Sequence, residues 1–376
     1  MKRLIICCDG TWNTPDQVHE GTPNPTNVVK FARAVRAQDD DGVHQIVFYD
    51  KGVGTGRGLD RITGGAFGTG LNDNIVDAYR FLVHNHRTGD EIYLIGYSRG
   101  AYTVRSVAGM LGRVGLLPKR HADKISLAYH HYKRKIHVLG DKELSDFRDE
   151  HGSHDEVPVH FLGVWDTVGA LGVPLRGLRF LTRKKHQFHD TDLGEGVHHA
   201  YHALAIDERR APFKPTLWTN PLAAHQTVEQ VWFAGVHGSV GGGQPSAELS
   251  DVALRWLISH AAHCGLAFDE AWLTAHVQPD PHGPIRNSKT GLYRLTRGIT
   301  RRIGRSGDTT QSVHPAVVHR TDARADYRPK NLMRFLDGFL RRIAQVNHPW
   351  GGPAGTTPTP ARQPGSALAN DDVVAT

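Results

Sequence analysis

One pattern constrains the fold more than any other: a short apolar run that ends at a glycine-rich turn carrying a polar residue, which occurs five times. The five segments are RLIICCDGTWN (3–13), HQIVFYDKGVGTG (44–56), EIYLIGYSRG (91–100), VPVHFLGVWDTVGA (157–170) and VEQVWFAGVHGSVGGG (228–243). Apolar and polar residues barely alternate within these runs, which is typical of parallel strands that are buried on both faces. We therefore expect five buried parallel strands.

Helical patterns lie between these runs. Segments 24–35, 71–86, 101–111 and 249–265 carry apolar residues at helical spacing. In the last of them, Ser250 is the expected N-cap and Gly265 the expected C-cap. Because strands and helices alternate along the chain, the sequence predicts an α/β fold with a mainly parallel sheet flanked by helices.

The same pattern suggests a domain organisation. Residues 1–346 are expected to form a single domain, with helical insertions near 112–156 and 171–227. From residue 347 the chain is rich in Pro, Gly, Ala and Thr, so residues 347–376 are expected to form a disordered tail.

The sequence contains no apolar run of the ~18 to 20 residues that a membrane-spanning helix needs. The run from Leu4 to Cys8 is too short for the core of a signal peptide. Cys7 and Cys8 should point to opposite faces of a strand and cannot easily bridge each other, which leaves free thiols together with Cys264. These observations favour a cytoplasmic location, with export by a secretion system as the alternative, and they carry no signal for an oligomeric state.

A polar side chain lies in the turn after each of the five apolar runs. In parallel sheets of this kind, ligands bind beyond the carboxyl ends of the strands. The residues at these ends are Asp9, Asp50, Ser98, Asp166 and His237. Their convergence predicts an active site at this edge of the sheet.

Ser98 lies in a Gly-Tyr-Ser-Arg-Gly pentapeptide between an apolar strand and an amphipathic helix, which is the arrangement of a nucleophile elbow. Gly96 and Gly100 are small enough to let the backbone segments approach each other. The N–H of Arg99 is then expected to face a developing oxyanion, with a second donor from Gly10 or Thr11 in the DGTWN loop. The alternative for this loop is that Asp9 merely caps its turn.

A serine nucleophile needs a histidine base that is oriented by a carboxylate. In α/β-hydrolases these residues follow in the order Ser, Asp or Glu, His, and Asp166 and His237 follow Ser98 in that order. Other acids are available between Ser98 and His237, but none of these candidates directly ends a clear apolar strand: Asp155, Asp190, Asp192 and Asp207. The sequence therefore predicts Ser98 as nucleophile, His237 as base and Asp166 as the orienting acid.

Several blocks together resemble one known family. They include CCDGTWN, YDKGVGTG, GYSRGAYTVRSVAGML, GVWDTVGALG, HALAIDERRAPFKPTLW and VWFAGVHGSVGGG, and they run from the N-terminus to about residue 260. They are similar to the α/β-hydrolase family catalogued as domain of unknown function 2235, which includes the catalytic domain of bacterial type VI secretion phospholipase effectors. The resemblance implies an α/β-hydrolase fold and an esterase or phospholipase triad at Ser98, Asp166 and His237. Many relatives have an aspartate two residues after the histidine, where this chain has Ser239.

Three features suggest other functions. His198 and His202 at helical spacing suggest a metal pair, but a histidine-rich surface helix is the favoured interpretation because two ligands do not make a site. The glycine-rich segment after residue 52 matches neither phosphate-binding motif and is expected to be a flexible loop near the cleft. The net charge of +7 and the basic run at 292–305 support the alternative of a non-catalytic basic protein that binds membranes or nucleic acid.

The favoured function is a serine hydrolase of carboxylic esters, with phospholipids as the leading substrate class. We expect it to require no cofactor or metal and to recognise no specific nucleic acid. Residues 171–186 interleave leucines with arginines and lysines, a pattern that suggests peripheral membrane contact, although an ordinary surface helix has the same pattern.

Overall fold

The structure is a computed structural model that describes residues 1–11, 13–52, 64–134, 141–153, 157–169, 192–295, 298–304 and 308–343. Three predictions therefore fall outside the described residues: the basic segment 171–186, most of the glycine-rich loop, and the tail 347–376.

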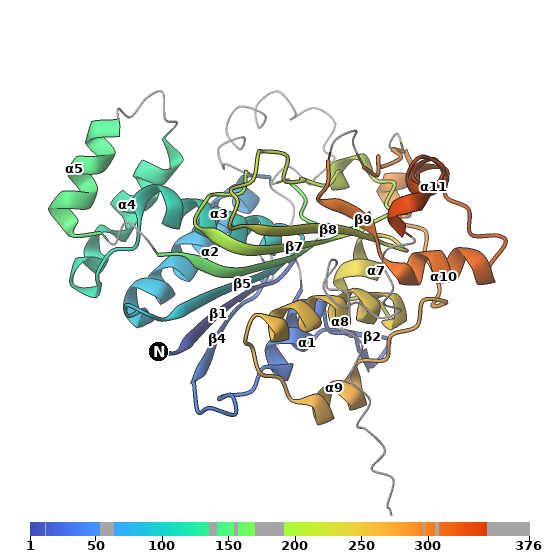
Figure 1. Ribbon diagram of the computed structural model, residues 1–376, viewed down its shortest axis with the longest axis horizontal. Helices are drawn as coiled ribbons and strands as arrows, with labels where there is room; N and C mark the ends of the chain where they lie inside the picture. The colour runs from blue at the N-terminus through green and yellow to red at the C-terminus, as the bar shows by residue number, and fades with distance from the viewer. Residues whose placement is uncertain are drawn as a thin grey trace, which may run out of the picture.

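A seven-stranded sheet forms the centre of the fold, and each neighbouring pair of strands is parallel (Figure 1). In spatial order the strands are β4 (Gln45–Asp50), β1 (Arg3–Cys8), β5 (Glu91–Tyr97), β6 (Val159–Trp165), β7 (Val197–Ala205), β8 (Thr227–Phe233) and β9 (Gln311–Val313). All five predicted runs are strands of this sheet. The strand order reverses between β1 and β5, which is where sheets of this type bind their ligands.

Helices cover both faces of the sheet (Figure 1). One face carries α2 (Gly64–Asn85), α3 (Arg99–Val114), α4 (Ile125–Lys133) and α5 (Asp141–His151), and the other carries α1 (Asn27–Ala34), α8 (Glu248–His263) and α9 (Glu270–His276). Alternate residues of β1 belong to different cores, with Cys8 in the first and Cys7 in the second. The chain thus has the predicted α/β fold, a parallel sheet flanked by helices, and its three cysteines are free and buried.

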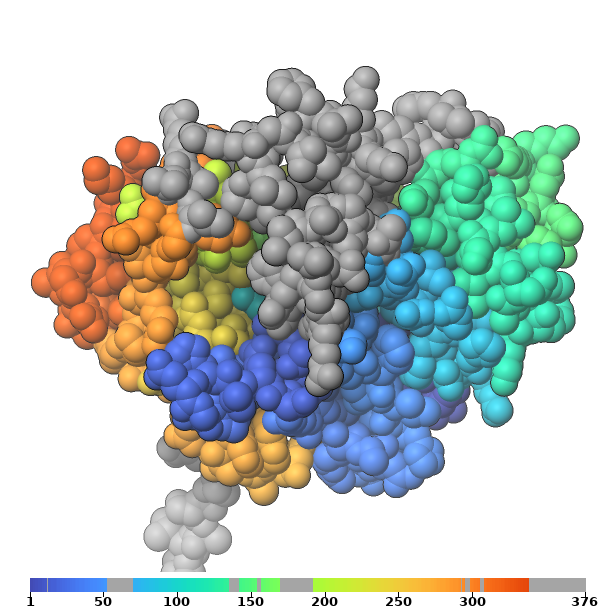
Figure 2. Space-filling view, turned by 180° about the vertical axis from the view of Figure 1, so that it is seen from behind, coloured from blue at the N-terminus to red at the C-terminus, as the bar shows by residue number. Residues whose placement is uncertain are grey.

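Segments that are far apart in sequence meet on the α1 face. In Figure 2 the N-terminal residues, in blue, lie beside yellow and orange residues from the second half of the chain. Isolated bridges join Thr26 to Gly242 and Val35 to Phe268. The loop that follows β1 is therefore held close to the loop that follows β8.

Two local predictions were wrong. His198 and His202 lie in β7 and not in a helix, because this segment pairs with β6 and β8 on both sides and so belongs to the sheet and not to an insertion. Helix α8 begins at Glu248 after the cap residue Ala247, so Ser250 lies inside the helix, where its hydroxyl donates to the Ala247 carbonyl. Gly265, with φ of +101°, follows the helix end as expected.

The C-terminal elements extend the sheet and its core. Strand β9 pairs with β8, and α10 (Pro315–Ala323) and α11 (Lys330–Ile343) contribute to a third apolar cluster with Leu204 and Trp232. Among the described residues, no helix is long and apolar enough to cross a membrane.

Gly100 makes the closest backbone contact in the α3 turn, because a Cβ atom there would lie 2.0 Å from the Cys8 carbonyl oxygen. We expect Gly100→Ala to lower the free energy of unfolding by about 3 kcal/mol, since overpacking against backbone cannot be relieved by a side-chain rotation. Gly112→Ala, in the same helix with open space around its Cβ position, should instead be neutral or stabilising by about 0.5 to 1 kcal/mol. Denaturant unfolding of the two variants tests this difference, and equal stabilities would contradict it.

Candidate active site

Ser98 lies in a strained turn between β5 and α3. Its backbone has φ of 58° and ψ of −114°, a region that L-residues rarely occupy. A Cβ atom on Gly96 would lie 2.6 Å from the Gly100 carbonyl oxygen, so both flanking positions require glycine. Strand, sharp turn and helix together have the shape of a nucleophile elbow.

The structure brings all three predicted residues of the triad together in one chain of hydrogen bonds. His237 Nε2 lies 2.8 Å from Ser98 Oγ, and His237 Nδ1 lies 2.6 Å from Asp166 Oδ2. Asp166 follows β6 with φ of 42°, and His237 is the first residue of the short helix α7 (His237–Gly241) after β8. All three side chains are buried, so the contacts form away from bulk water.

Arg301 is a fourth member of this chain, and the sequence analysis missed it. Its guanidinium forms two bonds with the Asp166 carboxylate, Nη1 to Oδ1 at 2.6 Å and Nη2 to Oδ2 at 2.9 Å. It also donates to the backbone carbonyl oxygens of Ala205 and Phe213. The residue is only 3% exposed, although it comes from the basic run 292–305 that suggested a binding surface. One arginine among 45 basic residues carried no signal that could have identified it.

Nearby charge and burial have opposite effects on the pKa of Asp166. Burial alone would raise the pKa of this carboxyl, but the Arg301 guanidinium and the His237 hydrogen bond outweigh it and hold the pKa below its ordinary value. The pKa of His237 is lowered because burial disfavours the imidazolium more than Asp166 stabilises it. The arrangement therefore favours a charged Asp166 beside a neutral His237, which is the state in which a histidine can accept a proton.

Aromatic and polar side chains surround the His237 imidazole. The rings of Tyr97 and Phe213 lie 4.8 Å from it, centroid to centroid. Its backbone N–H donates to Glu208 at 3.2 Å, and Glu208 in turn is paired with Arg210 at 2.9 Å. These contacts fix the start of α7 and with it the orientation of the ring.

The loop after β1 lies against Ser98, since a Cβ atom on Gly10 would be 3.3 Å from Ser98 Cβ. The Gly10 N–H already donates to Asp9 Oδ1 at 2.6 Å. Asp9 therefore caps this turn through its own side chain, which was the alternative interpretation of the loop. Thr11 is buried, and its hydroxyl has no hydrogen-bond partner among the described residues. Arg99 is the first residue of α3, as the elbow arrangement requires.

Asp9 and Asp50 lie at the same edge of the sheet but outside the hydrogen-bonded chain of Ser98. Asp9 Oδ2 accepts from the hydroxyls of Thr26 at 2.6 Å and Tyr49 at 2.8 Å, which ties β1, β4 and α1 together. Burial raises the pKa of Asp9 to about 6 against these hydrogen bonds, and burial with the nearby Asp77 raises that of Asp50 to about 7. Of the five residues at the strand ends, three thus form one hydrogen-bonded chain, Ser98, His237 and Asp166, and the carboxyls of Asp9 and Asp50 lie outside it.

The remaining candidates have other surroundings. Among the described residues there is no group of three or more His, Cys, Asp or Glu side chains that could hold a metal ion. His202 is fully buried and accepts a hydrogen bond from the Thr167 N–H at 3.1 Å, next to Asp166. Of the other acids, Asp192 is exposed and Asp207 accepts from Tyr327, while Asp155 and Asp190 lie outside the described residues.

Comparison with known proteins gives one family and a few distant relatives. Residues 2–260 match the family described as "T6SS, Phospholipase effector Tle1-like, catalytic domain". The "Uncharacterized protein YEL023C" of Saccharomyces cerevisiae is 29% identical over 239 residues, which are 58% of this chain and 33% of the yeast protein.

Two solved structures resemble the chain more loosely. An uncharacterized protein from Pseudomonas aeruginosa is 17% identical with a TM-score of 0.44, covering 75% of this chain and 49% of that one. The Tle1 effector bound to the VgrG spike of the type 6 secretion system is 16% identical with a TM-score of 0.36, covering 65% and 52%. The chain thus spans about a third of its yeast relative and about half of each solved chain.

Proposed function

Because the chain belongs to the Tle1-like family of type VI secretion phospholipase effector catalytic domains, we propose that it is a serine hydrolase that cleaves carboxylic ester bonds in phospholipids. One observation supports the serine mechanism above all others: the unbroken hydrogen-bonded chain from Ser98 through His237 to Asp166. The substrate class rests on the family.

In the proposed reaction, Ser98 Oγ attacks the ester carbonyl carbon while His237 Nε2 takes the hydroxyl proton. The tetrahedral intermediate collapses, the ester C–O bond breaks, and the imidazolium gives its proton to the leaving alcohol. Water then attacks the acyl-enzyme with His237 again as base, which releases the fatty acid and restores Ser98. Asp166 accepts the Nδ1–H bond throughout and stabilises the imidazolium, while Arg301 holds the carboxylate in place.

The oxyanion of the intermediate needs hydrogen-bond donors. We propose the Arg99 N–H at the start of α3 as one donor and the Thr11 N–H as the second, since the Gly10 N–H is already bound to Asp9. Each well-placed donor contributes about 3 kcal/mol to stabilisation of the transition state. The membrane contact predicted for residues 171–186 remains a further proposal.

A fluorophosphonate probe tests the proposal directly, because it labels only activated serines. We expect the wild-type protein to be labelled and the Ser98→Ala variant to remain unlabelled, with release of fatty acid from phospholipid vesicles following the same pattern. Folded wild-type protein that neither reacts with the probe nor releases fatty acid would refute the serine mechanism.

The acid limb of the pH–rate profile should follow the protonation of the His237 imidazole. Below its pKa the imidazole is protonated and cannot accept the Ser98 proton, so kcat/KM falls as the pH falls. Because burial lowers this pKa from 6.5, we expect the midpoint of the fall below pH 6.5. Replacing the exposed His225 with glutamine should leave the midpoint unchanged. A wild-type midpoint well above pH 6.5 would show that Asp166 outweighs burial.

A further inference from the structure

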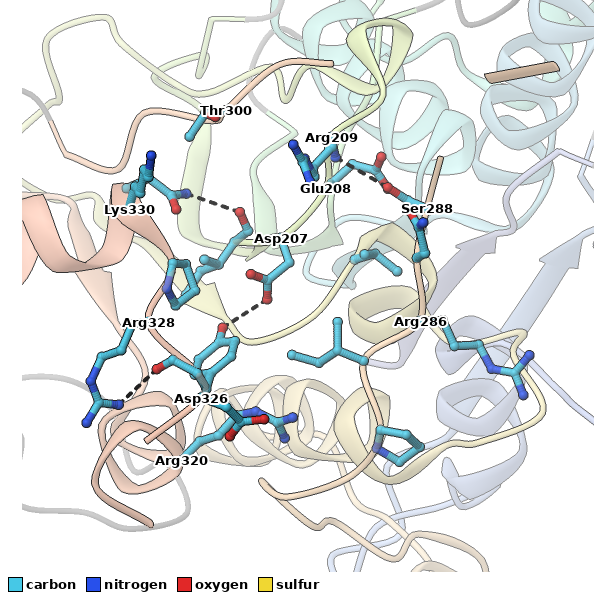
Figure 3. A pocket seen from close by; sticks show the side chains of 18 of the residues that line it. Asp207, Glu208, Arg209, Arg286, Ser288, Thr300, Arg320, Asp326, Arg328 and Lys330 are labelled. Carbon is cyan, nitrogen blue, oxygen red and sulfur yellow. Dashed lines mark hydrogen bonds between the residues drawn. The ribbon is translucent and has the colours of Figure 1, made fainter. Parts of the chain in front are cut away.

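A cavity of about 850 Å³ lies next to the candidate active site, and neither Ser98, Asp166 nor His237 is among its lining residues (Figure 3). Its wall includes residues 206–209, which directly follow β7, and Val236, which precedes His237. Residues 284–288, 299–300 and 326–331 line it as well. The cavity is therefore built at the carboxyl edge of the sheet but is separate from the hydrogen-bonded chain of Ser98.

Positive charge exceeds negative charge in this cavity. Six lining residues are basic, namely Arg209, Arg286, Arg320, Arg324, Arg328 and Lys330. Of the three lining acids, Glu208 pairs with Arg210 at 2.9 Å and Asp326 with Arg324 at 3.1 Å. Asp207 accepts from the Tyr327 hydroxyl and the Gly235 N–H. The other five basic side chains form no salt bridge with any described residue, so the cavity has a net attraction for anions.

Arg320 carries the strongest part of this argument because it is buried. The residue is 3% exposed, and Nη1 donates to the carbonyl oxygens of Pro281 and Gly283 at 2.5 and 2.8 Å. Its Nε has no hydrogen-bond partner among the described residues. The guanidinium also lies over the Tyr327 ring, 4.9 Å from its centroid, and the Asp207 and Asp326 carboxylates act on its charge from beyond salt-bridge distance. Since no carboxylate of a described residue pairs with Arg320 directly, an anion in the cavity would compensate its charge further.

Helix α11 adds a further attraction for anions. The helix has 14 residues, and its first residues Lys330 and Asn331 line the cavity, as does Pro329 before them. The free N–H groups and the dipole at a helix N-terminus favour negative charge. Figure 3 shows Lys330 and Arg328 on the same side of the cavity, with Arg286 across from them.

We propose that this cavity binds a phosphate group, carried either by a lipid headgroup or by a soluble phosphate compound. Its volume lies within the range of sites for small molecules. Arginine side chains with a helix N-terminus supply the charge-assisted donors that phosphate oxygens accept. Binding here is independent of ester cleavage at Ser98, so either proposal can fail without the other.

The first experiment titrates inorganic phosphate into the full chain by calorimetry. We expect saturable binding that weakens at least roughly tenfold in the double variant Arg286→Gln with Lys330→Gln, since each cation contributes about one charge-assisted bond. Both residues are exposed, so the variant should fold. Arg334→Gln is the matched control, because Arg334 is an exposed basic residue of α11 outside the cavity.

A second experiment separates the two sources of phosphate. Vesicles containing phosphatidic acid are mixed with the Ser98→Ala variant, which should leave the lipid intact, and inorganic phosphate is added as competitor. Competition assigns the cavity to a lipid headgroup, whereas phosphate binding without vesicle binding assigns it to a soluble compound. Absence of both kinds of binding, or binding that is unchanged in the double variant, would overturn the proposal.

Discussion

Replacing Ser98 with alanine is expected to lower ester hydrolysis by roughly a millionfold, to the level that binding and oxyanion stabilisation alone sustain. The variant keeps His237 and Asp166 but has no oxygen to form the acyl-enzyme. It loses a single hydrogen bond, that to His237 Nε2, so the free energy of unfolding should change by only about 1 kcal/mol.

The matched control for this variant is Ser145→Ala, which removes the hydroxyl of an exposed serine in α5. Its rate of fatty acid release should equal that of the wild type. Activity of the Ser98→Ala protein within tenfold of wild type, in a preparation with native circular dichroism, would mean that another residue is the nucleophile.

Replacing Asp166 with asparagine is expected to lower the rate by about 10⁴-fold, because the amide no longer holds the His237 tautomer that accepts the serine proton. The same change removes half of a buried ion pair. Arg301, with none of its side chain exposed, would lose its carboxylate, and such a loss typically costs about 3 to 5 kcal/mol of stability. Kinetics measured well below the unfolding midpoint separate the two effects.

The control here is Asp192→Asn. Asp192 also lies between Ser98 and His237 in sequence, but it is exposed in the loop before β7. We expect normal turnover from this variant. If Asp192→Asn lost activity while Asp166→Asn kept it, the acid would have been assigned to the wrong residue.

Much of this architecture could be predicted from local sequence. Ser98 and Asp166 directly follow buried strands, and His237 lies in the turn after β8, so the strand pattern and the rule that ligands bind at strand ends were sufficient to select them. In the same way, the uninterrupted burial of β1 follows from its continuous apolar run.

The parts that could not be predicted depend on tertiary contacts. Strand β7 contains His198, His199 and His202, which are unusual in a buried strand, and it is a strand because β6 and β8 pair with it on both sides. Arg301 lies in an irregular segment and reaches Asp166 across 135 positions of sequence, a contact that no periodicity reports. The tertiary structure was needed to show that the Arg301 guanidinium is buried.

The position of Arg301 in the sequence also limits which fragments of the protein can be expressed with an intact site. The match to the family ends at residue 260, and a fragment cut there would retain Ser98, Asp166 and His237, every residue that the motifs identify. It would lack the guanidinium that neutralises Asp166 and also β9, which covers the edge of β8. A useful expression fragment must therefore extend past both, and motif content alone is a poor guide to the smallest autonomous unit of this protein.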